Sequence, residues 1–255
     1  MEKELSDNAL NTRIPLFLAM FMLVVLITGC AKDGGVCVST NGPVIQQSRS
    51  LPAFNQIELL DNVCLILTND TGNQVMVEAG EYIIEGIKTE VVDGKLTIMN
   101  KNQCNWLRDY SKPKNVYLSG NKIWGIKYNS SGDIRSDDTL KLDSLKVEVW
   151  GGCGTIDLSI DVWQGSFSLN MGTVDMHLHG VSAITTVYAD DYGFFDARDL
   201  RTGYTYITNR GSNDCYVNAT NHLEAIIGSI GNIYYSGNPK SINVQIDGSG
   251  KVLPY

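Results

Sequence analysis

The sequence predicts an all-β protein: a single-stranded parallel β-helix, or solenoid, with turns of about 20 residues. Two observations predict it. Glycine recurs at intervals of 18 to 22 residues between residues 130 and 252, and the residue two positions after each glycine is apolar in six of seven cases. Because side chains two apart on a strand share a face, each glycine is expected to open a short strand whose even positions point inward. A period near 20 residues with such alternation is typical of a solenoid. The recurring glycines are Gly132, Gly154, Gly172, Gly193, Gly211, Gly231 and Gly250.

The same count predicts the interior. We expect one stacked column of buried side chains and a right-handed solenoid. Cys215, four residues after its glycine, is expected to face inward as a small buried hydrophobe. The column is expected to contain Ile156, Val174, Phe195 and Ile233.

Composition limits the function. With 255 residues, 43% of them hydrophobic, the chain can bury a substantial core. The formal net charge of −8 argues against a nucleic-acid partner, because no basic stripe is available to neutralise phosphates. Neither a phosphate-binding glycine motif nor a nucleophile elbow is present, and we expect no cofactor.

The N-terminus reads as a lipoprotein signal peptide over residues 1–29. Residues Ile14 to Ile27 carry no formal charge. A 14-residue helix spans about 21 Å, short of the roughly 30 Å of a bilayer core. The run ends at Cys30 in the residues ITGC, which resemble a bacterial lipobox, although the preceding residues are acidic where signal peptides are normally basic. We expect lipid attachment at Cys30; the alternative is a transmembrane anchor.

The rest of the chain divides into a tether and one domain. Residues 30–50 are polar without a sustained period, which predicts a flexible tether, and residues 51–255 are expected to form the folded domain. Alternating apolar residues predict strands around a turn at Asp61-Asn62, and Asp93-Gly94 predicts a hairpin. A short helical turn fits residues 81–88, and residues 100–114 are expected to form a loop.

Four stretches of this domain resemble the head GIN domain family of auto-transporter adhesins. They are LPAFNQIEL with TEVVDGKLTI in the first half, and IGNIYYSGNPK with GSGKV near the C-terminus. The resemblance spans residues 51–252 and is weaker in the middle turns. It implies a parallel β-helix in a cell-envelope lipoprotein of the Bacteroidota type, and it carries no catalytic motif.

Four aspartates stand three residues after successive glycines: Asp157, Asp175, Asp196 and Asp214. Their odd position predicts an outward-facing acidic ladder with neighbouring turns about 4.8 Å apart. Like charges that lie opposite each other destabilise a sheet, so a bridging Ca²⁺ is one hypothesis, and a shifted register with screening by water and salt is the other. A metal site is a further hypothesis, because three possible ligands alternate on one strand: Asp175, His177 and His179. The simpler interpretation is an ordinary row of outward-facing polar side chains.

An outward aromatic face is the second candidate site. Phe194, Tyr216 and Tyr234 are expected on successive turns, where their rings could stack against a glycan or contact a protein ligand.

The sequence favours a non-catalytic binding or adhesion module in the outer membrane, at the cell surface or the periplasmic face, held to the membrane by the lipid. The alternatives are a carbohydrate-active β-helix enzyme, for which residues 190–201 are the densest acidic and basic cluster, and a purely structural envelope component. Five cysteines besides Cys30 leave the disulfide pairing open: Cys37, Cys64, Cys104, Cys153 and Cys215.

Overall fold

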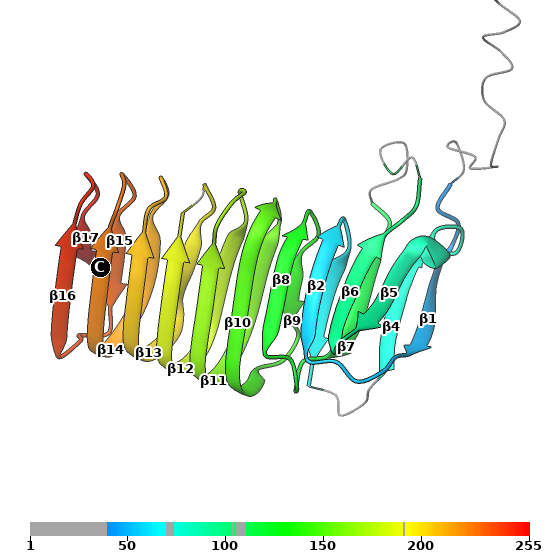
Figure 1. Ribbon diagram of the computed structural model, residues 1–255, viewed down its shortest axis with the longest axis horizontal. Helices are drawn as coiled ribbons and strands as arrows, with labels where there is room; N and C mark the ends of the chain where they lie inside the picture. Colours follow the sequence, from blue (N-terminus) through cyan, green and yellow to red (C-terminus); the bar gives the residue numbers. More distant parts are fainter. Residues whose placement is uncertain (1–39, 70–73, 104, 106–110, 191) are drawn as a thin grey trace, which may run out of the picture. The chain divides into compact units, whose positions relative to one another are not determined.

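The protein is described here by a computed structural model that covers residues 40–69, 74–103, 105, 111–190 and 192–255, and Thr40–Tyr255 form a compact unit of their own. That unit is a parallel β-solenoid of about 6 turns spaced by about 20 residues, as predicted (Figure 1). The hand of the solenoid stays a prediction. The strands are β1 (Val44–Ser50), β2 (Gln56–Asp61), β3 (Cys64–Thr68), β4 (Gln74–Gly80), β5 (Ile87–Val92), β6 (Lys95–Asn100), β7 (Lys114–Ser119), β8 (Gly125–Ser130), β9 (Ile134–Ser136), β10 (Leu140–Gly152), β11 (Thr155–Leu169), β12 (Asp175–Ala189), β13 (Phe195–Asn209), β14 (Cys215–Ile227), β15 (Ile233–Ser236), β16 (Ser241–Ile246) and β17 (Val252–Pro254), with one 3-10 helix, η1 (Ile84–Gly86).

The long strands β11 to β14 each contribute to two faces of the solenoid. The first face consists of β1, β4, β7, β3 and β9, the first halves of β11 to β14, and then β15 and β17. The second face consists of β5, β6, β2, β8 and β10, the second halves of β11 to β14, and then β16. In β11 the alternation of buried and exposed side chains changes phase at Trp163-Gln164, both of which are exposed. The chain bends there from one face to the other, so one continuous strand serves both.

The interior is a continuous apolar core between the two faces. Tyr128, Phe167 and Phe195 are among its largest fully buried side chains. The hydroxyl of Tyr128 donates a hydrogen bond to the carbonyl oxygen of Gly132 over 2.7 Å, which satisfies the one polar group that this ring takes into the core. Burial raises the pKa of Tyr128 well above its ordinary value, so the phenol stays neutral.

Three of the four residues predicted for the interior column lie in it: Ile156, Phe195 and Ile233. Strand register pairs Ile156 with Met176, Met176 with Phe195, Phe195 with Cys215, and Cys215 with Ile233. Val174 is buried, but it lies two residues before Met176 and outside this column. Cys215 faces inward, as expected.

The error arises because the recurring glycines do not all occupy the same place in the turn. Register places Val174 beside Gly154, and a Cβ at Gly193 would collide with the carbonyl of Val174. Gly172, with φ of 123°, lies beside Gly152, two residues before Gly154. It is therefore displaced by two residues from the position that Gly154 and Gly193 share.

The N-terminal end of the unit is built differently from the repeating turns. Val44–Ser50, which the sequence analysis assigned to the tether, form strand β1 and pair antiparallel with β4. The Asp93-Gly94 hairpin is confirmed: β5 and β6 pair antiparallel, and both turn residues have positive φ. The helical turn expected within residues 81–88 is η1, a single 3-10 turn. Part of the predicted 100–114 loop lies outside the described residues.

Several expectations concern residues that the structure does not describe. Cys30, the signal peptide, Cys37 and Cys104 fall among them. Within the described ranges, Cys64 and Cys153 form no disulfide. No helix in those ranges has the length and apolar character needed to cross a bilayer.

Candidate functional site

The outer surface of the first face carries the predicted site residues, in a different order from that expected. Register pairs Asp157 of β11 with His177 of β12, His177 with Asp196 of β13, Asp196 with Tyr216 of β14, and Tyr216 with Tyr234 of β15. Acidic, imidazole and phenol side chains thus follow one another along the solenoid. The expected ladder of four adjacent aspartates is wrong, because His177 separates Asp157 from Asp196.

The other two aspartates lie in a neighbouring column, where they bind backbone amides of the next turn. The Oδ1 atom of Asp175 accepts a hydrogen bond from the N–H of Phe194 over 3.0 Å, and Oδ1 of Asp214 accepts one from the N–H of Asn232 over 2.9 Å. Asp133 accepts from the N–H of Thr155 in the same way over 2.8 Å. These carboxylates fix the corners between turns, a structural role that the sequence analysis missed. The reason to expect a bridging Ca²⁺ is thereby removed.

The two histidines of β12 face acids on the adjoining turns. His179 lies with Nε2 3.1 Å from Oδ1 of Asp157 and Nδ1 3.7 Å from Oδ2 of Asp199. His177 lies 3.9 Å from Asp196. Over the part of the chain that the structure describes, no group of three or more histidine, cysteine, aspartate or glutamate side chains is arranged to hold a metal ion.

The three aromatic side chains predicted for this face are in contact. The rings of Tyr216 and Tyr234 stack with centroids 4.9 Å apart, and Phe194 lies 5.5 Å from Tyr216. Tyr255, which the sequence analysis did not include, meets Tyr216 edge-on at 5.7 Å. We call Phe194, Tyr216, Tyr234 and Tyr255 the aromatic row. The ring of His177 extends it toward the middle of the solenoid, 6.1 Å from Phe194.

A charged pair holds one edge of the aromatic row. The guanidinium carbon of Arg198 lies 4.7 Å from the centroid of Tyr216, and Nε of Arg198 donates to Oδ1 of Asp196 over 2.9 Å. Partial burial raises the pKa of Asp196, but the hydrogen bonds and charge of Arg198 outweigh this and hold that pKa below its ordinary value. The carboxylate therefore stays ionised, and the guanidinium stays fixed over the ring.

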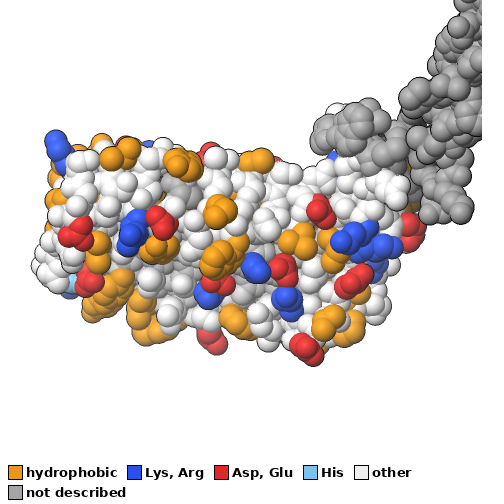
Figure 2. Space-filling view, turned by 45° about the horizontal axis from the view of Figure 1, so that its top comes forward, with side chains coloured by type: hydrophobic (Ala, Val, Ile, Leu, Met, Phe, Trp, Pro, Cys, Tyr) orange, Lys and Arg blue, Asp and Glu red, His pale blue; other side chains and the backbone are white. Residues whose placement is uncertain are grey.

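In the densest acidic and basic cluster, residues 190–201, each of three described carboxylates has a partner of its own. Asp196 is engaged by Arg198, Asp199 faces His179, and Asp190 accepts a hydrogen bond from the hydroxyl of Tyr188 over 2.9 Å. Glycoside chemistry needs two carboxylates that flank one bond. These acids instead have separate partners on an open strand surface, where Asp199 is 79% exposed. On the face that Figure 2 shows, acidic and basic side chains are interspersed without a large patch of one sign.

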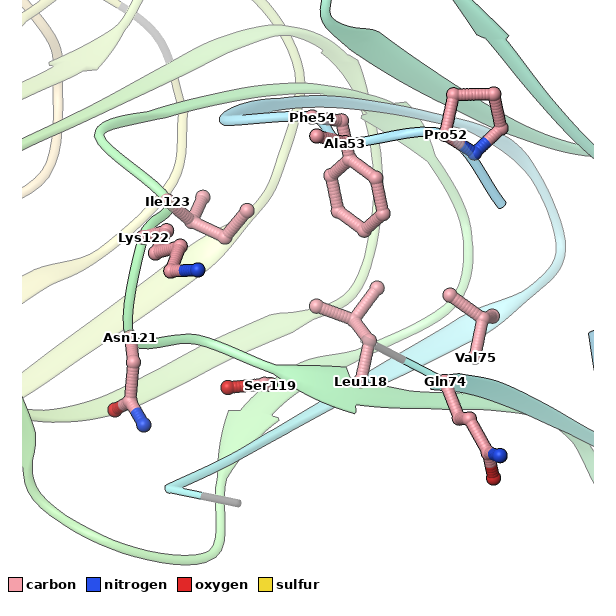
Figure 3. A pocket seen from close by; sticks show the side chains of 10 residues that line it. All are labelled: Pro52, Ala53, Phe54, Gln74, Val75, Leu118, Ser119, Asn121, Lys122 and Ile123. Carbon is pink, nitrogen blue, oxygen red and sulfur yellow. The ribbon is translucent and has the colours of Figure 1, made fainter. Parts of the chain in front are cut away.

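An apolar pocket lies toward the N-terminal end, between the loop before β2 and the segment that follows β7. Its volume is about 300 Å³, and Phe54, Leu118 and Ile123 point into it, whereas the polar ends of Gln74 and Asn121 point away (Figure 3). The residues come from distant parts of the chain. No local sequence pattern marks this pocket.

Two adjoining open depressions follow the bend between the faces. They share Leu142, Asp143 and Asp161, and each carries one exposed tryptophan, Trp124 in one and Trp163 in the other. Trp163 stands where the inward alternation of β11 breaks, and this signal could have found it in the sequence.

Comparison with known proteins places the fold. The family model "Putative auto-transporter adhesin, head GIN domain" matches residues 53–239. A search of curated proteins found no match. Solved structures from Bacteroidales species share the fold at low identity. A "putative adhesin" from Bacteroides fragilis is 21% identical with a TM-score of 0.77, covering 84% of this chain and 97% of its own.

Two Parabacteroides structures are similar in the same way. A "putative adhesin" from Parabacteroides merdae is 17% identical with a TM-score of 0.59, and a "Putative lipid binding protein" from Parabacteroides distasonis is 16% identical with a TM-score of 0.65. Each match covers 85% of this chain and 98% of the other. At such identities these likenesses show the fold alone. The family model matches well over half of the residues, and the chain belongs to the head GIN domain family.

Proposed function

We propose that this protein is a lipid-anchored protein of the outer membrane whose solenoid is a non-catalytic binding module, and that the aromatic row binds a glycan. The adhesin-like family supports a protein of the cell envelope or surface. The lipobox-like residues that end at Cys30 support the anchor. The observation that carries the proposal is the stack of Tyr216 on Tyr234, flanked by Phe194 and Tyr255.

The geometry of the aromatic row suits a ligand with apolar ring faces and polar edges. Aromatic rings offer a large, rigid contact area at a small entropic cost, since few torsions have to be fixed on binding. Tyrosine hydroxyls add hydrogen-bonding groups at the edges of the rings, and the guanidinium of Arg198, over the ring of Tyr216, adds further donors. Sugar rings present C–H groups on their faces and hydroxyls around their rims. A saccharide chain lying on the row would match both features.

A glycan-binding assay tests the proposal. The unit Thr40–Tyr255 is applied to a glycan array, and Tyr216→Ala is compared with Tyr192→Ala, a control at a tyrosine that is 72% exposed and outside the aromatic row. We expect wild type and the control to bind the same glycans, and Tyr216→Ala to bind about tenfold more weakly, as for a central aromatic contact. Thermal melting checks that each variant is folded.

The proposal would be contradicted by binding that is independent of Tyr216, or by cleavage of the bound polysaccharide by the wild-type protein. The second result would support the alternative of a carbohydrate-active enzyme. If Tyr192→Ala weakened binding as much as Tyr216→Ala does, the aromatic row would not be the specific binding site.

A second candidate function is binding of a small apolar ligand in the pocket around Phe54. A volume of about 300 Å³ lies at the lower end of the range for ligand pockets. One similar structure is described as a lipid-binding protein. Native mass spectrometry with palmitate tests this candidate: Ala53→Trp, at the exposed rim, should prevent binding, and Asn55→Trp, two residues further on and outside the lining, should not.

A further inference from the structure

The C-terminal end of the solenoid leaves an apolar strand uncovered. All six residues of β16 are exposed, and within the described residues β16 is hydrogen-bonded along one side only, to β14. Ile242, Val244 and Ile246 are 39%, 48% and 52% exposed. Their register partners in β14, Leu223, Ala225 and Ile227, are completely buried. The three β16 side chains thus continue the interior columns without a following turn to cover them.

At the opposite end of the unit, a charged side chain covers part of the edge of β5. The guanidinium of Arg49 donates hydrogen bonds to the carbonyl oxygens of Ile87, at the start of β5, and of Ile84. Glu85, Lys88 and Glu90 place charges around the same edge. Charged side chains and a covered backbone are the usual protection of an edge strand. Strand β16 has neither: its sequence SINVQI contains no charge and no proline, whereas β17, the last strand of the first face, ends in Pro254.

We propose that a second copy of this chain covers β16, and that the two β16 strands pair antiparallel about a two-fold axis at Val244. An exposed strand edge offers free N–H and C=O groups, which another strand can satisfy by addition to the sheet. The solenoid needs a cover on this end, because terminal repeats with an apolar outer face are not soluble on their own. The hydrophobic side chains seen toward the left end in Figure 2 lie at the end where Figure 1 places β16.

The sequence of β16 is self-complementary in this arrangement. Pairing about Val244 puts Val244 opposite its own symmetry mate and Ile242 opposite Ile246 of the second copy, all on the inward side. On the outward side, Asn243 lies opposite Gln245 of the second copy. Cross-strand aliphatic pairs and amide pairs stabilise antiparallel strands, and no two like charges face each other.

The charges at the two ends of β16 favour the same orientation. Exposed Lys240 precedes the strand, and exposed Asp247 follows it. In an antiparallel pair each lysine approaches the aspartate of the other copy, whereas a parallel pair would bring like charges together. A head-to-tail stack would instead set β16 against β5, the edge strand of the second face at the N-terminal end, where Arg49 already binds the carbonyl oxygen of Ile87. The arrangement is an isologous, closed dimer.

Sedimentation velocity of Thr40–Tyr255 over a range of concentrations tests the proposal. We expect a reversible dimer for wild type. Val244→Lys, which sets two ammonium groups face to face at the axis, should be monomeric throughout. The matched control is Val181→Lys: Val181 is 44% exposed on β12, away from the end, and its variant should dimerise like wild type. A wild type that remains monomeric, or a Val244→Lys variant that still dimerises, overturns the proposal.

A charge swap tests the antiparallel orientation separately. Asp247→Lys should weaken the dimer severalfold, because two lysines then approach each other at both ends, and the double variant Lys240→Asp/Asp247→Lys should restore it. Both substituted side chains are exposed, so the variants are expected to fold. A double variant as weak as the single one would contradict the antiparallel pairing.

Discussion

The guanidinium of Arg198 lies over the ring of Tyr216, with its central carbon 4.7 Å from the ring centroid. The same guanidinium binds Asp196, whose side chain is only 13% exposed. One arginine thus neutralises a carboxylate and supports the central ring of the aromatic row. The position of Arg198 on the proposed binding surface therefore depends on whether Asp196 is ionised.

Replacing Arg198 with methionine should raise the pKa of Asp196, because burial continues to disfavour the charged carboxylate and its hydrogen bonds to Arg198 are gone. In wild type the folded-state pKa of Asp196 is depressed. Its contribution to stability is therefore present above the unfolded-state pKa and is lost as the pH falls through the folded-state pKa. The variant should be less stable than wild type at neutral pH, and the difference should vanish in acid. Urea unfolding from neutral to acidic pH measures this.

Arg135→Met is the matched control for that experiment. Arg135 binds Asp137 at the same spacing of two residues, with Nε 2.9 Å from Oδ1, but Asp137 is 47% exposed. An exposed pair contributes at most about 1 kcal/mol, so this variant should change the unfolding free energy less than Arg198→Met does. Equal losses in the two variants, independent of pH, would contradict the role assigned to Asp196.

The sequence predicted burial better than it predicted neighbours. Counting from each glycine assumed that all seven occupy the same place in a turn, whereas Gly172 and Gly211 each lie two residues early. A displacement of two residues keeps a side chain on the same side of its strand, so Val174 is buried as expected. The same displacement sets Asp175 opposite Thr155 and sets Tyr216, in place of Asp214, opposite Asp196. The four aspartates therefore do not form one column.

The contacts within the aromatic row were predicted despite the wrong register, because aromatic side chains are long. Phe194 stands in the column of Asp175 and Asp214, not in that of Tyr216, yet its ring reaches Tyr216 diagonally. The apolar pocket had no such signal. Its lining includes Phe54 and Ile123, which come from separate turns. How these turns pack together depends on loop lengths, and no periodic pattern in the sequence encodes them.

Gly180 should not tolerate a side chain. Its φ is 105°, and an added Cβ would collide with the carbonyl group of Ile160 on the preceding turn. We expect Gly180→Ala to lower the unfolding free energy by about 2 kcal/mol, through backbone strain and displacement of the neighbouring strand. Gly125→Ala is the control, because the nearest atom to its Cβ would be Cγ of Gln56 at 3.4 Å. Similar melting temperatures for the two variants would show that the close approach at Gly180 is relieved cheaply.

Lipid attachment at Cys30 is tested in cells. The full chain, expressed in a bacterium that processes lipoproteins, should incorporate labelled palmitate and fractionate with the membrane. Cys30→Ala should lose the label, because the acceptor thiol is gone. Cys153→Ala, at the exposed thiol that the structure describes, is the control and should keep it. Label that persists in Cys30→Ala would exclude this cysteine as the attachment site.

Ile233 tests the solenoid core itself. It is completely buried between Cys215 and Val252 in the interior column. Ile233→Asp would place a carboxylate there without a partner, and we expect it to lower the unfolding free energy by roughly 4 kcal/mol or to prevent folding. Ile230→Asp makes the same chemical change three residues earlier, at a side chain that is 63% exposed, and should change stability by less than about 0.5 kcal/mol. Thermal and urea unfolding of both variants measure the contrast. Wild-type-like melting of Ile233→Asp would contradict the interior column, since a buried, unpaired carboxylate cannot be accommodated at so little cost.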